Sequence, residues 1–258
     1  MRLKILGCSG GVGGPLRSTC LQLDHDIIID SGTGVGDLTL EEMAALRHIF
    51  LTHTHMDHIS FLPLLIDSIF DRIKEPIIIH ALPESIEALR KHIFNWIIWP
   101  DFSKLPSTDH PVIKFEPMRP GEKITLDGRT IEMIPVNHVV PGVGYRVEGP
   151  QGVFAFSGDT TSNDCFWQGL NARDRLDLLI VECAFTDDDL ELSKKAYHYC
   201  PSLLTDDIAK LKHRPDVYIT HAKPGQECVI CEQVKTALQK LSIHVPVQCL
   251  TGGEIFTL

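Results

Sequence analysis

Three histidines and one aspartate fall within six residues, at His53, His55, Asp57 and His58. The preceding run, residues 47–52, contains β-branched and aromatic residues and lacks helix caps, which predicts a buried strand. If this strand continued to position 57, the first two histidines and Asp57 would point the same way, and a turn would bring in His58. Histidines buried together without ligands would leave ring nitrogens unpartnered, at a cost in free energy. The motif therefore predicts a metal site, with a solvated polar turn as the alternative.

Three further polar side chains directly follow apolar, strand-like runs: His138, Asp159 and His221. Each would lie at the carboxyl end of a strand, where sites in sheet proteins are usually built. Singly, such an aspartate commonly caps a turn, and such a histidine commonly bonds a carbonyl group. Together with the first motif they make seven imidazole or carboxylate ligands. That donor set suits zinc or another first-row transition metal better than magnesium or calcium, which prefer oxygen ligands.

The elements that must position these residues are strands and helices spread through both halves of the chain. Apolar runs predict strands at residues 3–6, 20–23, 27–30, 47–52, 76–80, 177–182, 217–220, 245–250 and 254–256, and several more between 112 and 156. Helical patterns occur at residues 41–45, 59–69, 83–95, 202–213 and 227–241. Helices distributed among many strands predict an α/β protein whose sheets are covered by helices. We expect one domain over residues 1–258.

A glycine-rich loop, residues 7–15, follows the first predicted strand. Such a loop binds phosphate when it opens a helix. Here Pro15 and another strand-like run, at residues 20–23, follow the loop, so there is no helix for it to open. A dinucleotide-binding fingerprint and a P-loop are therefore rejected.

Composition indicates an ordinary soluble globular protein. The 258 residues are 43% hydrophobic and 22% charged, and the formal net charge of −10 does not favour nucleic acid or anionic lipid as a partner. The first apolar run is too short for a signal peptide, and no stretch approaches the ~18 apolar residues of a membrane span. We expect a cytoplasmic protein without a membrane partner. Its eight cysteines are expected to be free thiols, with Cys228 and Cys231 as neighbours on a helix rather than a zinc or redox pair.

The seven candidate ligands, in their order along the chain, resemble the metallo-β-lactamase fold superfamily. The motif His53-x-His55-x-Asp57-His58 and the three later ligands extend over most of the chain. The resemblance implies a four-layer αββα sandwich with two metal ions at one edge. It assigns the first ion to His53, His55 and His138. It assigns the second ion to Asp57, His58 and His221, with Asp159 bridging the two.

Residues outside this ligand set resemble supporting parts of superfamily sites. Asp30, after its strand, is similar to a buried aspartate that braces the histidine loop; an ordinary turn carboxylate is the alternative. Glu182 and His198 are similar to a Glu–His pair of the phosphodiesterase branch, which includes tRNase Z. A histidine oriented by a carboxylate is a suitable proton donor to the alkoxide that leaves a phosphodiester. The alternatives are a solvated Glu182 and a His198 on a helix surface. With Asp57, this pair makes up the predicted catalytic residues.

The substrate prediction depends on residues far from the ligands. Residues 92–100, which include Phe94, Trp96 and Trp99, and residues 59–69 resemble class II cyclic nucleotide phosphodiesterases. The resemblance implies hydrolysis of 3′,5′-cyclic nucleotides (cAMP or cGMP) to 5′-nucleotides by a hydroxide that bridges two divalent ions, with zinc preferred over manganese or iron. It also implies a homodimer. The Phe94–Trp99 stretch would then be a dimer face or a pocket wall, with a core plug as the alternative.

Other functions remain open at this point. A tRNase Z-like RNA phosphodiesterase would need a glycine- and lysine-rich arm to bind tRNA, and the chain has none. Hydrolysis of another cyclic phosphate is a closer alternative. A protein that binds through a metal site without catalysis is disfavoured, because it has no need of seven ligands and a Glu–His pair. A glyoxalase-like thioesterase is disfavoured because it has no need of the Glu–His pair.

Overall fold

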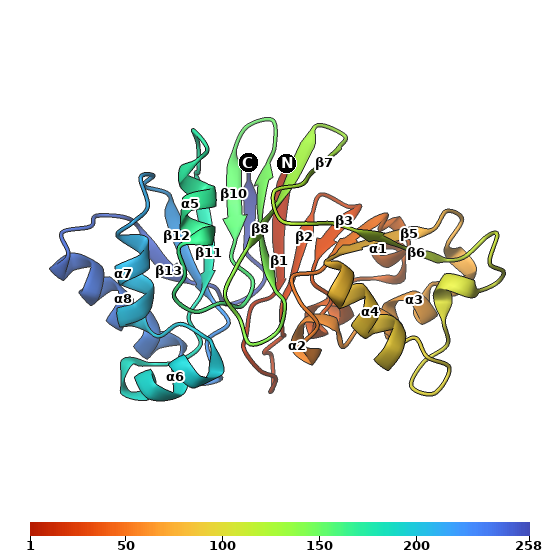
Figure 1. Ribbon diagram of the computed structural model, residues 1–258, viewed down its shortest axis with the longest axis horizontal. Coiled ribbons are helices and arrows are strands. Elements are labelled where there is room, and N and C mark those ends of the chain that lie inside the picture. The colour runs from red at the N-terminus through yellow and green to blue at the C-terminus, as the bar shows by residue number, and fades with distance from the viewer.

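Two seven-stranded mixed sheets face each other in the computed structural model, which describes residues 1–258 (Figure 1). The first sheet has the order β14 (Ile255–Thr257), β1 (Arg2–Gly7), β2 (Cys20–Leu23), β3 (Ile27–Ile29), β4 (His48–Phe50), β5 (Ile77–Ala81) and β6 (Ile113–Pro117). The second sheet has the order β13 (Val247–Cys249), β12 (Asp216–Thr220), β11 (Leu178–Glu182), β10 (Val153–Phe156), β9 (Val143–Glu148), β8 (Arg129–Pro135) and β7 (Lys123–Leu126).

Each sheet is antiparallel on one side and parallel on the other. In the first sheet, β3, β4, β5 and β6 are parallel neighbours. In the second, β10, β11, β12 and β13 are parallel, and β8 runs in the same direction because β9 pairs antiparallel with both β8 and β10. Within each sheet, strands that share a direction bring their carboxyl ends to one edge, where loops can gather a site.

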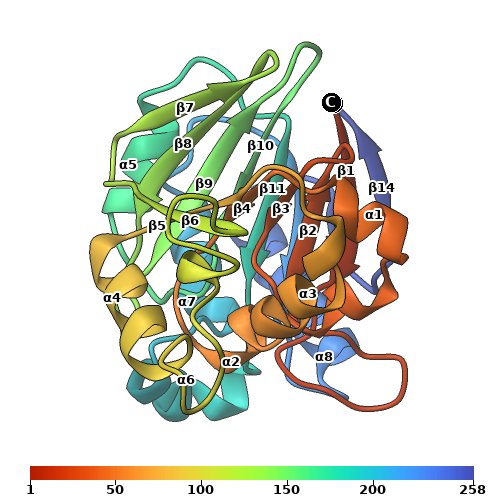
Figure 2. The same cartoon turned by 90° about the vertical axis from the view of Figure 1, so that its right-hand side faces the viewer.

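Helices cover the outer faces of both sheets. The helices are α1 (Leu40–Ala45), α2 (Met56–Ile59), α3 (Leu62–Ser68), α4 (Pro83–His92), α5 (Cys165–Asn171), α6 (Leu190–Ala196), α7 (Pro201–Ile208) and α8 (Glu227–Lys240). Figure 2 shows α1, α3 and α4 in front of the first sheet, and Figure 1 shows α5, α7 and α8 outside the second. One apolar cluster lies between the sheets and one lies under each helical layer. This arrangement confirms the predicted four-layer αββα sandwich.

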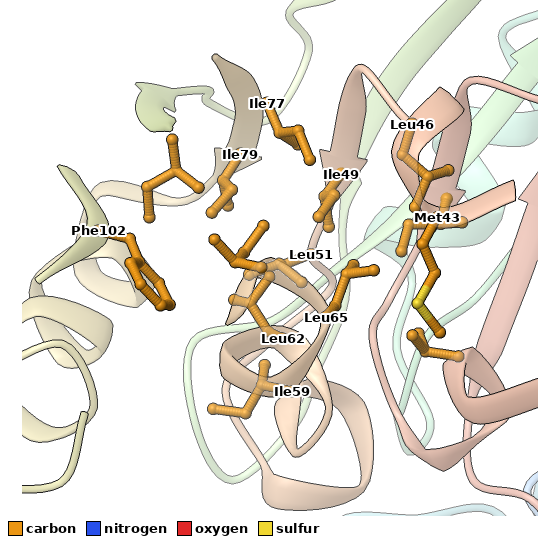
Figure 3. Packing of buried hydrophobic residues seen from close by; sticks show 14 of the residues in the cluster. Met43, Leu46, Ile49, Leu51, Ile59, Leu62, Leu65, Ile77, Ile79 and Phe102 are labelled. Carbon is orange, nitrogen blue, oxygen red and sulfur yellow. The ribbon is translucent and has the colours of Figure 1, made fainter. Parts of the chain in front are cut away.

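The apolar cluster between the first sheet and its helices holds both ends of the histidine motif. Leu51 precedes the motif and Ile59 follows it, and both side chains are buried in this cluster with Leu62 and Leu65 (Figure 3). Full burial of one such side chain contributes about 1.5–3 kcal/mol. The intervening polar residues are therefore fixed by packing on either side of them.

The chain does not stay extended to position 57, so the condition for His53, His55 and Asp57 to point the same way along one strand is not met. Strand β4 ends at Phe50, His55 is the last extended residue, and α2 begins at Met56. The backbone N–H of His58 donates to the carbonyl of His55, so Asp57 and His58 lie on one helical turn. An aspartate in a first helical turn is favoured by the helix dipole, and no cross-strand partner holds the chain extended there.

Several predicted helices are shorter than their sequence patterns. Residues 59–69 divide into the end of α2 and a separate α3, residues 83–95 end as a helix at His92, and α7 covers only the first part of residues 202–213. Beyond α4, the Asn95 side chain accepts hydrogen bonds from the N–H groups of Ile97 and Ile98. Such local side-chain bonds compete with helix continuation. The two sides of this turn lie in different environments. Phe94 is buried in the core, whereas Trp96 is 58% exposed.

The cysteines are free, and Cys228 and Cys231 lie on α8 as predicted. None of the helices combines the length and the apolar character needed to cross a membrane.

Arg129, the first residue of β8, joins the two sheets through a buried ion pair. Its two terminal nitrogens donate to Asp26 Oδ1 at 2.6 Å and Oδ2 at 2.8 Å, and Asp26 lies in the turn between β2 and β3. Burial alone would raise the pKa of Asp26, but the hydrogen bonds and charge of Arg129 outweigh burial and hold this pKa below its ordinary value. The pair therefore stabilises the fold above about pH 4, and this stabilisation is lost as the pH falls through the lowered pKa.

Arg129→Leu is expected to reduce the free energy of unfolding at pH 7 by about 3 kcal/mol, because Asp26 would remain buried without its partner. Urea unfolding of the two proteins at pH 7 and near pH 3.5 measures the effect. The difference in unfolding free energy between the two proteins should be smaller at the lower pH, where Asp26 becomes protonated. An equal difference at both values would contradict an electrostatic role.

Candidate metal centre

The seven predicted ligands meet at one edge of the sandwich, beyond the ends of four strands. His53 to His58 follow β4, His138 follows β8, Asp159 follows β10 and His221 follows β12. The structure arranges their donor atoms in two groups that share Asp159, and the atoms within each group lie within 4.8 Å of one another. The groups are His53, His55, His138 and Asp159, and Asp57, His58, Asp159 and His221.

The first group points imidazole nitrogens at a common space. His55 Nδ1 lies 3.2 Å from His138 Nε2. His53 Nε2 lies 3.5 Å from Asp159 Oδ2. Two ligand atoms that each bind a tetrahedral zinc ion at 2.0–2.1 Å are separated by roughly 3.3 Å. These separations are those of atoms that surround one ion.

The second group has similar dimensions. His221 Nε2 lies 3.1 Å from Asp57 Oδ2 and 3.1 Å from Asp159 Oδ2. His58 Nε2 lies 3.2 Å from Asp159 Oδ1. Asp159 thus presents one oxygen to His53 and the other to His58, and it can serve both groups at once.

Two buried nitrogens test whether these residues fit a metal ion. His53 Nε2 and His58 Nε2 are both inaccessible and have no hydrogen-bond partner, although Asp159 oxygens are near them. A buried polar atom without a partner costs about 1–3 kcal/mol. Nitrogens that approach a carboxylate without hydrogen-bond geometry are placed to share an ion with it rather than a proton. The donor set of imidazoles and carboxylates fits zinc and other first-row divalent metals.

The charge states of His53 and Asp159 also suit metal binding. Burial, and then the neighbouring His58, lower the pKa of His53 well below its ordinary value, so its lone pair is free. Burial would raise the pKa of Asp159, but His221 and His58 outweigh it and hold this pKa well below its ordinary value. Metal ligands must be deprotonated, and these two are already in that form near neutral pH.

Glu182 and His198 lie beside this centre. Glu182, at the end of β11, is fully buried, and its Oε1 accepts a 2.7 Å hydrogen bond from His198 Nδ1. Both residues have donor atoms within 4.8 Å of Asp159. Burial would lower the pKa of His198, but the carboxylate of Glu182 outweighs it and raises this pKa above its ordinary value. The structure rules out a solvated Glu182 and a His198 on a helix surface, because His198 is only 8% exposed and follows α6.

A family model described as the beta-lactamase superfamily domain matches residues 25–245 of the chain. The chain belongs to this superfamily. The match spans all seven candidate ligands and confirms the resemblance drawn from their order. Among solved structures, this superfamily member is similar to unliganded yeast PDE1, with a TM-score of 0.84 and 19% identity over 100% of this chain and 99% of that one. At that identity the likeness establishes the fold alone.

Curated relatives of this superfamily member include two proteins named for cyclic nucleotides. A Yersinia pestis protein named "Probable 3′,5′-cyclic-nucleotide phosphodiesterase" is 27% identical, over 70% of this chain and 58% of that protein. The Saccharomyces cerevisiae "3′,5′-cyclic-nucleotide phosphodiesterase 1" is 31% identical, over 49% of this chain and 34% of that protein. The chain thus spans between about a third and three fifths of the length of these two relatives.

Around the candidate ligands, this superfamily member has a layer of orienting hydrogen bonds. Asp30 is fully buried; its Oδ1 accepts from the backbone N–H of Thr52 at 2.8 Å, and its Oδ2 accepts from His58 Nδ1 at 2.7 Å. This geometry favours a brace for the histidine loop over an ordinary turn carboxylate. His138 Nδ1 in turn donates to the carbonyl of Tyr197 at 2.9 Å. Such contacts fix the orientation of an imidazole ligand.

Two of these supporting groups were not identified from the sequence. Thr52 Oγ1 contacts both Asp30 Oδ2 at 2.8 Å and His53 Nδ1 at 3.0 Å. Its position directly before the motif is the one signal that could have found it. Tyr197 contributes a backbone carbonyl, which every residue possesses, so its side-chain type gives no signal.

Asp30→Asn is expected to weaken metal binding roughly 10- to 100-fold. Asparagine has a single side-chain oxygen, which must replace the two carboxylate oxygens that accept from Thr52 and His58. Asp30 has a φ of 61°, and asparagine tolerates this left-handed conformation, so the backbone should be preserved. Competition of the protein with a chromophoric chelator for Zn²⁺ measures the affinity, and circular dichroism checks the fold. Wild-type affinity in a folded variant would show that Asp30 does not brace the ligands.

Proposed function

We propose that this chain is a metal-dependent phosphodiesterase that hydrolyses 3′,5′-cyclic nucleotides to 5′-nucleotides. The observation that carries the proposal is the buried hydrogen bond between Glu182 and His198 beside Asp159. A proton donor next to a metal centre is suited to a reaction that releases an alkoxide. The names of the two curated relatives support the choice of substrate.

The proposed centre holds two divalent ions, with zinc preferred and manganese or iron as alternatives. His53, His55 and His138 would hold the first ion, and Asp57, His58 and His221 would hold the second, with Asp159 shared. When bound, such ions polarise a phosphoryl group and activate water. Asp57 is the more exposed of the two carboxylates in the ligand set, with a side chain 30% accessible against 2% for Asp159.

His198 is proposed to protonate the leaving O3′ atom. Its Nδ1 is engaged with Glu182, so Nε2 is the nitrogen left to carry the donated proton. Glu182 is held in turn by three backbone N–H groups, those of Thr160 at 2.9 Å, Ala184 at 3.1 Å and Tyr199 at 3.3 Å. A carboxylate fixed by three donors keeps the imidazole in one orientation and stabilises its charged form. The raised pKa of His198 agrees with a proton donor.

A small substrate fits the charge of the chain better than RNA. The formal net charge is −10, whereas affinity for a polyanion comes from many basic phosphate contacts. A cyclic nucleotide presents one phosphodiester to the proposed centre and needs no such surface.

A hydrolysis panel tests this function on metal-analysed protein. The panel contains cAMP, cGMP, cyclic dinucleotides, bis(p-nitrophenyl) phosphate and pre-tRNA. We expect release of a 5′-nucleotide from a 3′,5′-cyclic mononucleotide, abolished by chelation and restored by added Zn²⁺ or Mn²⁺. Cleavage of pre-tRNA alone would replace the proposal with the RNA alternative. If protein with both metal sites filled hydrolysed none of these phosphodiesters, the alternative of a non-catalytic binding protein would be favoured instead.

A further inference from the structure

The glycine-rich loop after β1 lies directly against the segment that carries His221. The carbonyl of Cys8 accepts from the backbone N–H of His221 at 2.7 Å and from Thr220 Oγ1 at 3.0 Å. The N–H of Gly10 donates to the carbonyl of Ala222 at 3.0 Å. The loop therefore contacts the chain immediately before, at and after this candidate ligand, although the two segments are far apart in the sequence.

His221 lacks the hydrogen bond at Nδ1 that His53, His58 and His138 have. His58 Nδ1 is bonded to Asp30 and His138 Nδ1 to a carbonyl, but His221 Nδ1 is buried without a partner. Its backbone is also in the left-handed region, with a φ of 64°, which a histidine adopts only where its surroundings impose it. Because Nε2 faces Asp57 and Asp159 in the proposed metal site, something other than a hydrogen bond to Nδ1 must hold the far side of this ring in place.

Gly10 occupies the position that could do so. A Cβ atom on Gly10 would lie 2.3 Å from the carbonyl oxygen of His221 and 2.9 Å from its Nδ1. The first distance is to backbone, which cannot move aside as a flexible side chain can. The absence of a side chain at position 10 thus lets the loop close on both the backbone and the ring of His221.

We propose that the glycine-rich loop is the positioning device for His221, and that Gly10 is a positioning residue for the second metal ion. The loop takes the place of the carbonyl or carboxylate that usually orients a histidine ligand. The inference rests on the metal centre of the proposed function, but not on the identity of the substrate.

Gly10→Ala tests this inference through Zn²⁺ binding to metal-free protein, measured by chelator competition. The second equivalent should bind roughly 10- to 100-fold more weakly than in the wild type, while the first equivalent is unchanged. Gly152→Ala is the matched control. There an added Cβ would lie 3.0–3.1 Å from Leu258, before β10 and at the end of that strand away from Asp159, and both equivalents should bind normally.

A double-variant cycle separates positioning from general destabilisation. His221→Ala should itself weaken the second equivalent, and adding Gly10→Ala to it should cause no further loss if both act on one ligand. Additive losses, or an unchanged second equivalent in Gly10→Ala, would overturn the inference. A wild-type protein that binds fewer than two equivalents would instead contradict the proposed centre.

Thr220→Val provides a milder route should Gly10→Ala fail to fold. It removes the Thr220 hydrogen bond to Cys8 with little change of shape. The second equivalent should then weaken less than in His221→Ala but measurably. No change in a folded Thr220→Val protein would count against the loop as a positioning device.

Discussion

Replacing His198 with alanine is expected to reduce turnover of the cyclic nucleotide roughly 10²–10⁴-fold, which is the usual contribution of a positioned general acid. Metal content should be retained, because the two metal-binding groups that contain the seven ligands do not include this residue. Steady-state hydrolysis and elemental analysis of the same preparation provide the two measurements. Glu182→Gln should cause a smaller loss, since the amide can still accept from His198 Nδ1 but carries no charge.

His244→Ala is the matched control for this experiment, because His244 is exposed and distant in sequence from every ligand. Its turnover should equal that of the wild type. If His198→Ala kept full turnover with normal metal content, the proton would have to come from elsewhere and the acid role would be wrong. If it lost metal as well as turnover, His198 would belong with the ligands.

Asp159→Ala is expected to abolish tight binding of at least one metal equivalent and to reduce hydrolysis to background. Asp159 belongs to both proposed metal sites and also adjoins the Glu182–His198 pair. Removing it takes an oxygen from each site and leaves the Nε2 atoms of His53, His58 and His221 without the Asp159 carboxylate as a neighbour. The loss in affinity should exceed the 10- to 100-fold that is typical of changes in supporting residues. Elemental analysis after gel filtration measures the equivalents retained.

Asp164→Ala controls for the loss of a nearby negative charge. Asp164 is exposed and pairs with Lys210 at the surface, so its removal should change neither metal content nor activity. An Asp159→Ala protein that still carried two tight equivalents would contradict the shared-ligand assignment.

The positions of the distant ligands were predictable because of a simple rule about sheets. His138, Asp159 and His221 were selected only because each comes directly after an apolar, strand-like run, and the structure brings all three to one edge. Strands of the same direction bring the residues after their carboxyl ends to the same edge, so long separations in sequence do not matter. The Glu182–His198 contact could be inferred only by resemblance, since nothing in the local pattern relates a strand end to a residue 16 positions later.

Other features had no signal in the residue types. The turn into α2 was missed because a histidine-rich motif has no apolar alternation that distinguishes strand from helix. His138 contacts a backbone carbonyl, and His221 contacts the carbonyl of Cys8 and the glycine at position 10. These contacts depend on the tertiary structure, so the residue types give no sign of them. The glycine-rich loop was correctly separated from phosphate-binding motifs, but its contact with residues 220–223 depends on tertiary structure alone.

The two sheets contribute ligands in nearly equal number: four come from the loop after β4, and three come after strands of the second sheet. An ion bound in the proposed centre would therefore act as a cross-link between the two halves of the sandwich. By mass action, free metal at 1,000 times its dissociation constant adds about 4 kcal/mol to the free energy of unfolding, more than the Arg129–Asp26 pair is expected to contribute. The melting temperature of this protein should then depend on its metal supply, and a chelated sample should melt at a lower temperature than a metal-loaded one.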